Sequence, residues 1–150
     1  MPIDYEAPTV APPPLLLQEM EDRARLEPAV GRVLVVEDDP AQRELLVEML
    51  LAWRYQPLAV GTAEEAEHAA RRNHFEAAIV DIFLPGKSGE ALIGTLRERF
   101  PDSVLIGISA LGDSMMARRC KVKGADLFLS KPIDPEALAQ ALQTNHKSWH

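Results

Sequence analysis

The chain has 150 residues, 47% of them hydrophobic, so it is long enough for one domain with a real core and short for two. Its formal net charge is −7 at pH 7, and such a chain lacks the positive field that general binding of nucleic acids or anionic membranes requires. No basic leader opens the sequence and the apolar runs are too short to cross a bilayer, so we expect a cytoplasmic protein. Cys120 is the only cysteine, which excludes an intramolecular disulfide and a cysteine-based zinc site.

Residues 1–31 differ in composition from the rest of the chain. Six of the twelve prolines fall among the first 28 residues, which predicts an extended arm without a core of its own. Within this arm, residues 15–28 (LLLQEMEDRARLEP) are compatible with a short helix that places Leu17, Met20 and Ala24 on one side. A helix this short needs a surface to dock on. We favour the domain's own surface over a dimerisation or partner segment, and we expect residues 32–150 to form the folded domain.

From Arg32 onward, predicted strands and helices alternate along the chain. Asp39 is the predicted N-cap of the first helix, with proline at its first position, and Thr62 and Glu65 predict a capping box for the second. The continuous apolar runs suit strands buried on both faces. Such alternation predicts an α/β fold, a doubly wound parallel sheet covered by helices on both faces. The predicted strands cover 32–37, 55–60, 75–81, 103–109 and 126–130, and the predicted helices cover 39–53, 62–73, 90–99, 113–123 and 134–144.

The chemistry-bearing residues follow the predicted strands directly. In open α/β sheets the ligand site lies beyond the carboxyl ends of the strands, so these side chains are expected to meet at one edge. The residues at the strand ends are Glu37 and Asp38 after the first strand, Asp81 after the third, Ser109 after the fourth and Lys131 after the fifth.

Clustered carboxylates raise one another's pKa unless a cation lies among them. Magnesium suits such a site because it takes one or two carboxylates and leaves room for phosphate oxygens. Asp81 would then act as a nucleophile toward phosphorus and form an acyl phosphate. Lys131 and the metal would neutralise the phosphoryl oxygens, and Ser109 would donate a hydrogen bond.

Four short motifs carry a family resemblance. VLVVEDDP, VDIFLPGKSG, GISA and FLSKP, in this order and at these strand ends, resemble the receiver domain of two-component response regulators, over about Arg32 to Gln143. The resemblance implies a flavodoxin-like (βα)5 fold with strand order 2-1-3-4-5. It also implies a cis bond between Lys131 and Pro132.

The resemblance assigns a role to each motif residue. It implies Mg2+ as the cofactor, and Glu37 and Ser109 depart only mildly from the family's commoner aspartate and threonine. Phe83 and Leu111 occupy positions that tune the lifetime of the phosphoryl group, and we hypothesise that their apolar side chains lengthen it. The implied site consists of Asp81 as phosphoacceptor, Asp38 as direct metal ligand, Glu37 as ligand through water, the Phe83 backbone carbonyl as metal ligand, Ser109 and Lys131 as phosphoryl contacts, and Phe128 as the switch aromatic.

The expected function is that of a phosphorylation-activated receiver. The phosphoryl donor would be a sensor histidine kinase or a histidine phosphotransfer protein, and the output would run through contacts with a downstream protein target. The chain would catalyse only its own phosphoryl uptake and loss, so we do not expect an enzyme in the ordinary sense. Homodimer formation is left open, and neither nucleic acid nor membrane is an expected partner. The alternative is a receiver-fold docking or dimerisation module that works without phosphorylation.

Other phosphate-binding classes fit the residues less well. A flavin or dinucleotide binder needs a glycine- or hydroxyl-rich phosphate loop after the first strand, where this chain has EDDP. A haloacid-dehalogenase-type phosphatase needs a second acid two residues after its nucleophile, where this chain has Phe83.

Overall fold

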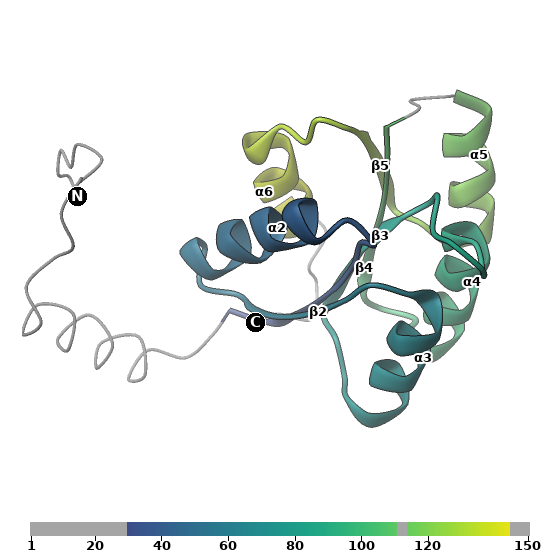
Figure 1. Cartoon of the computed structure of the whole chain (residues 1–150), viewed down its shortest axis with the longest axis horizontal. Coiled ribbons are helices and arrows are strands. Elements are labelled where there is room, and N and C mark those ends of the chain that lie inside the picture. The colour runs from purple at the N-terminus through teal and green to yellow at the C-terminus, as the bar shows by residue number, and fades with distance from the viewer. Residues whose placement is uncertain (1–29, 111–113, 145–150) are drawn as a thin grey trace, which may run out of the picture.

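A five-stranded parallel sheet forms the centre of the structure, a computed structural model that describes residues 30–110 and 114–144 (Figure 1). The strand order is β2-β1-β3-β4-β5, as the resemblance implied. The predicted arm and its short helix lie almost wholly outside the described residues. The strands are β1 (Arg32–Val36), β2 (Gln56–Val60), β3 (Ala77–Asp81), β4 (Val104–Ser109) and β5 (Leu127–Ser130), and the helices are α2 (Pro40–Ala52), α3 (Ala63–Arg72), α4 (Gly89–Arg99), α5 (Ser114–Lys123) and α6 (Pro135–Thr144).

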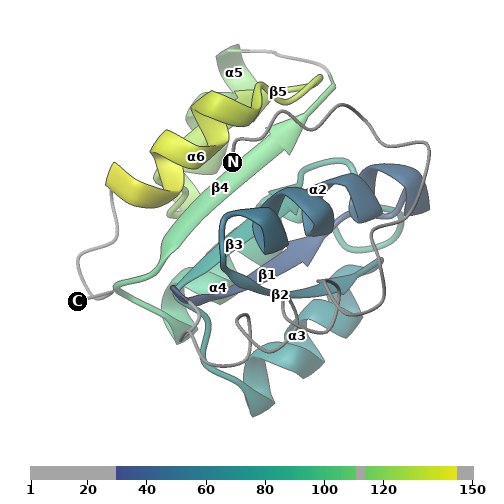
Figure 2. The same ribbon diagram turned by 90° about the vertical axis from the view of Figure 1, so that its left-hand side faces the viewer.

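Helices cover both faces of the sheet. Figures 1 and 2 show α2 and α6 on one face and α3, α4 and α5 on the other. Leu46, Leu50 and Leu138 belong to the core on the first face, and Leu92 and Ile93 to the core on the second. The strands β3 and β4 are buried along their whole length, which explains why their sequences are continuous apolar runs instead of alternating ones.

The helix starts follow local capping signals. Asp39 caps α2, since its carboxylate accepts a hydrogen bond from Ala41 N at 3.3 Å. Thr62 Oγ1 accepts from Glu65 N at 3.1 Å, which is half of the predicted capping box. The other half differs, because the Glu65 carboxylate accepts from Gly61 N at 3.0 Å instead of from the N-cap residue itself.

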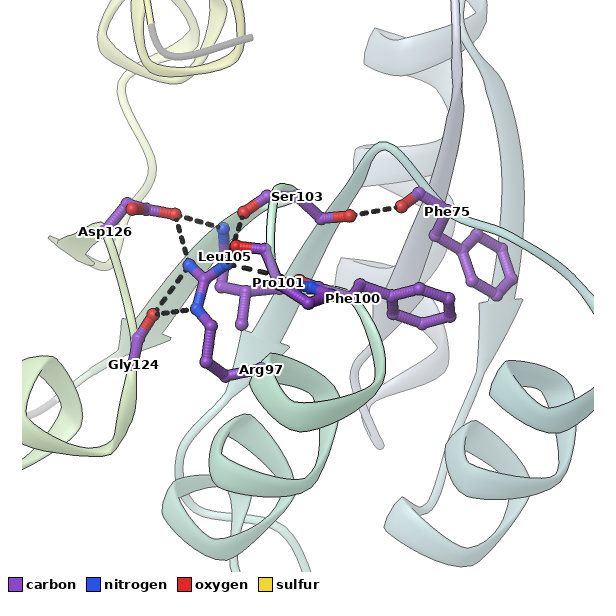
Figure 3. Close-up of polar contacts among 8 residues, drawn as sticks. All are labelled: Phe75, Arg97, Phe100, Pro101, Ser103, Leu105, Gly124 and Asp126. Atoms are coloured by element: carbon purple, nitrogen blue, oxygen red, sulfur yellow. Dashed lines mark hydrogen bonds and ion pairs between the residues drawn. The ribbon is translucent and has the colours of Figure 1, made fainter. Parts of the chain in front are cut away.

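One arginine ties together the connections at the edge of the sheet where β4 and β5 begin (Figure 3). The Arg97 guanidinium on α4 donates to the Asp126 carboxylate at 2.8 Å, and the same carboxylate accepts from Leu105 N at 2.8 Å. The Arg97 guanidinium also donates, over 2.8 to 3.2 Å, to the backbone carbonyls of Phe100, Pro101, Ser103 and Gly124. The amino ends of β4 and β5 are thereby fixed, opposite the edge where the predicted site residues lie.

No helix among the described residues is long and apolar enough to span a membrane.

Candidate functional site at the carboxyl ends of the strands

Three carboxylates meet where β1 and β3 end. One oxygen from each of Glu37, Asp38 and Asp81 lies within 4.8 Å of the other two. Glu37 and Asp81 are only 1% and 5% exposed, whereas Asp38 is exposed to solvent. Burying two carboxylates side by side is costly unless positive charge compensates them. The two buried carboxylates therefore need a positive charge close by.

Lys131 supplies part of that charge. Its Nζ lies 2.7 Å from Glu37 Oε1 and 2.8 Å from Asp81 Oδ2, so a single ammonium group joins two carboxylates from different strands. Its backbone N donates to the Ser109 carbonyl at 2.8 Å, which fixes the start of the segment after β5. The Lys131–Pro132 peptide bond is cis, in agreement with the family resemblance.

The surroundings raise the pKa of both Glu37 and Lys131, for different reasons. Burial is the main reason that the pKa of Glu37 is raised, and the nearby Asp81 charge adds to the effect while Lys131 opposes it. Burial by itself lowers the pKa of Lys131, but its hydrogen bonds to Asp81 and Glu37 outweigh that effect and raise it. Lys131 therefore carries its positive charge at neutral pH.

Backbone donors fix the remaining carboxylate oxygens. Asp81 Oδ1 accepts from Phe83 N at 3.0 Å, and Glu37 Oε2 accepts from Asp39 N at 3.2 Å. Arg43 was not predicted from the sequence, yet its Nη1 donates to the Glu37 carbonyl at 2.9 Å and so positions the residue that binds Lys131. No sequence signal distinguishes this arginine from a solvated residue in the first turn of a helix.

Gly89 allows the start of α4 to approach the backbone of Asp81 closely. A Cβ atom at Gly89 would overlap with the carbonyl oxygen of Asp81, and Gly89 N donates to the Ile82 carbonyl at 3.0 Å. Gly86 has a φ of +79°, which only glycine adopts at little cost. These contacts explain why two glycines follow the phosphoacceptor candidate so closely.

The other predicted site residues lie nearby, in different surroundings. Ser109 is fully buried at the end of β4, and Phe83 is 48% exposed just after β3. Phe128 on β5 is partly buried and packs against the core on the α3–α5 face, next to Gly107. Leu111 lies outside the described residues.

The donor set fits a hard divalent ion. Carboxylate oxygens are the ligands that Mg2+ prefers, and the exposed Asp38 leaves one side open to water and to phosphate oxygens. Lys131 provides one positive charge against the three carboxylates, so a divalent cation would complete the compensation.

Known proteins have sequences similar to that of this chain. Residues 33–143 match the response regulator receiver domain family. The response regulator protein FleR of Pseudomonas aeruginosa is 36% identical over 108 residues, which are 72% of this chain and 23% of FleR. The transcriptional regulatory protein AruR of the same species is 39% identical over 116 residues, 73% of this chain and 46% of AruR.

A solved structure extends the comparison. A response regulator protein from Burkholderia pseudomallei with a phosphorylated aspartic acid, a calcium ion and citrate superposes with a TM-score of 0.72. It is 30% identical, and the match covers 77% of this chain and 68% of that one. This chain spans less than half the length of FleR and of AruR. The family match over most of the chain, together with the sheet order and the acidic cluster, shows that the chain belongs to the receiver domain family of two-component response regulators.

Proposed function

We propose that the chain accepts a phosphoryl group on Asp81 and signals through protein contacts. One observation carries the proposal: Lys131 joins the buried Asp81 and Glu37 carboxylates at the edge where Asp38 also lies. A structural ion pair needs only two partners, whereas phosphoryl transfer needs a nucleophile, a metal site and a cation for the phosphoryl oxygens.

The donor would be a phosphohistidine on a sensor histidine kinase or a histidine phosphotransfer protein. A carboxylate oxygen of Asp81 forms the new P–O bond as the P–N bond breaks, and the electron pair of that bond returns to the donor imidazole. Lys131 Nζ and the Ser109 hydroxyl would bind oxygens of the transferred group. Asp38, Asp81, the Phe83 carbonyl and, through water, Glu37 would hold Mg2+, which supplies charge neutralisation at the phosphoryl oxygens.

The readout would follow from the added charge. A phosphoryl group on Asp81 offers strong acceptors that draw Ser109 toward it and shift the segment after β4. Phe128 would then turn into the space that this shift opens. The protein would shift its population toward a second conformation, in which the face formed by α5, β5 and α6 binds a downstream protein. In this reading residues 32–150 form the receiver and residues 1–31 an appended arm.

Intact mass spectrometry tests the proposal directly. The wild-type protein is incubated with acetyl phosphate and Mg2+, beside Asp81→Asn and the control Asp102→Asn, an exposed aspartate that precedes β4 at the opposite edge. We expect one added phosphoryl group in the wild type and in Asp102→Asn and none in Asp81→Asn. If the wild type gains none, from acetyl phosphate or from a phosphorylated histidine donor, the proposal is wrong and the docking module replaces it.

A further inference from the structure

An apolar groove lies beside the acidic cluster, between α2 and the connection from β5 to α6. It encloses 410 Å³. Leu45, Met49, Pro132 and Ile133 line its walls, and Glu37 and Lys131 reach its inner end. A volume of this size is in the range of occupied binding pockets, although this groove is open along one side.

The α2 wall of the groove continues as a stripe of apolar side chains. Leu45, Met49 and Trp53 are spaced four residues apart, so they follow one side of α2 down to its last turn. Leu45 is 57% exposed, and Met49 and Trp53 are partly buried, packed against the core on this face. An exposed leucine that continues an apolar groove forms an apolar patch with it, and contiguous apolar patches are found at interaction sites.

The chain enters the folded part at the far end of this stripe. Val30 N donates to the Arg54 carbonyl at 2.8 Å, so the first described residue of the chain lies at the carboxyl end of α2. The 13 residues of α2 span about 20 Å. Residues 17–27 as a helix would span about 15 Å, and three extended residues would add about 10 Å. Leu17 can therefore reach Leu45 along the whole stripe.

We propose that residues 15–27 dock as an amphipathic helix in this groove, parallel to α2. Leu17, Met20 and Ala24, which share one side of that helix, would lie against Leu45 and Met49. The occupant is this chain's own segment because a tether this short holds it at an effective concentration of about millimolar, well above that of a second copy.

Disulfide trapping tests the docking without any phosphorylation. Leu17→Cys is combined with Leu45→Cys in a Cys120→Ala background, which removes the only native cysteine. The matched control combines Leu17→Cys with Leu51→Cys. Leu51 lies on the same helix and is 58% exposed, nearly the same as Leu45, but it does not line the groove. Both engineered sites on α2 are exposed, so neither substitution removes core packing.

After oxidation with diamide at low protein concentration, we expect the Leu45 pair to form an intramolecular disulfide in most molecules. The Leu51 pair should form it several-fold more slowly. Intact mass and non-reducing electrophoresis separate cross-linked monomers from cross-linked dimers. Equal rates for the two pairs, or no disulfide with Leu45→Cys, would overturn the proposal. Dimers whose yield rises with protein concentration would also overturn it, in favour of a second copy as the occupant.

Discussion

At the level of single residues, the charge balance of the acidic cluster depends on Lys131. Replacing it in Lys131→Met leaves two buried carboxylates without their cation, and we expect a loss of about 3 kcal/mol in unfolding free energy at neutral pH. Burial already raises the pKa of Glu37, so this carboxyl binds its proton more tightly in the folded protein. The stability cost should therefore shrink as the pH falls through that raised pKa.

Urea unfolding of Lys131→Met and wild type over a pH series from about 8 down to about 4 checks this. A penalty that stays constant over the whole series would mean that the lysine acts through packing alone. Lys121→Met, an exposed lysine on α5, is the control, and its effect should stay within about 0.5 kcal/mol.

Phe83 offers a second test, one that depends on the proposed phosphorylation. Its side chain is 48% exposed just after β3, two residues beyond Asp81, where it would hinder a water that attacks the acyl phosphate. In Phe83→Asn we expect the phosphorylated protein to decay several-fold faster, measured by intact mass over time. Val122→Asn, which replaces an 83% exposed side chain on α5, should decay like the wild type. An unchanged decay rate for Phe83→Asn would show that this side chain does not shield the phosphoryl group.

At the level of elements, α4 contains two glycines with opposite constraints. A Cβ at Gly89 would overlap with backbone atoms of Asp81 and Ile82, whereas a Cβ at Gly94 would come no closer than 3.7 Å to Lys123. Gly89→Ala should therefore displace the strand end that carries Asp81 and lower the unfolding free energy by about 2 kcal/mol or more. Gly94→Ala should be neutral or stabilising by up to about 1 kcal/mol, because alanine favours the helix. Thermal unfolding of both variants measures the difference, and equal effects would contradict the close approach.

The same helices show which element boundaries could be predicted from the sequence. Asp39 and Pro40 signal the start of α2 through their own chemistry, so a local pattern was sufficient there. Arg54 follows α2 with a φ of 74°, a conformation that glycine or asparagine usually adopts at the end of a helix. Because the residue here is an arginine, its type does not signal that the helix ends. The need for glycine at position 89 was also unpredictable. It arises from a close contact with the backbone of Asp81 and Ile82 at the end of β3, and no local sequence pattern in α4 reveals that contact.

At the level of the whole molecule, the parallel sheet explains why the site residues converge. Every strand ends at the same edge, so residues as far apart as Glu37 and Lys131 meet once the order β2-β1-β3-β4-β5 is established. The sequence motifs predicted that edge and its residues. The hydrogen bond between Lys131 and Glu37 was not predicted, because its formation depends on side-chain reach across the sheet. The apolar groove was missed for a similar reason, since its walls come from two segments separated by most of the chain.

The convergence also predicts that Mg2+ stabilises the entire fold. An ion bound only by the folded state adds RT ln(1 + [L]/Kd), about 2.7 kcal/mol at 100 times the dissociation constant. Asp38 is exposed, so Asp38→Asn should change the unfolding free energy by no more than about 0.5 kcal/mol without Mg2+ and should remove most of the gain with it. Glu48 is an exposed residue on α2, and Glu48→Gln removes one negative charge just as Asp38→Asn does. This control variant should keep the stabilisation by Mg2+. Urea unfolding of the three proteins with Mg2+ and with EDTA separates a bound ion from general charge screening. If Asp38→Asn kept the gain as Glu48→Gln does, the stabilisation would come from screening of the −7 net charge and the cluster would hold no ion.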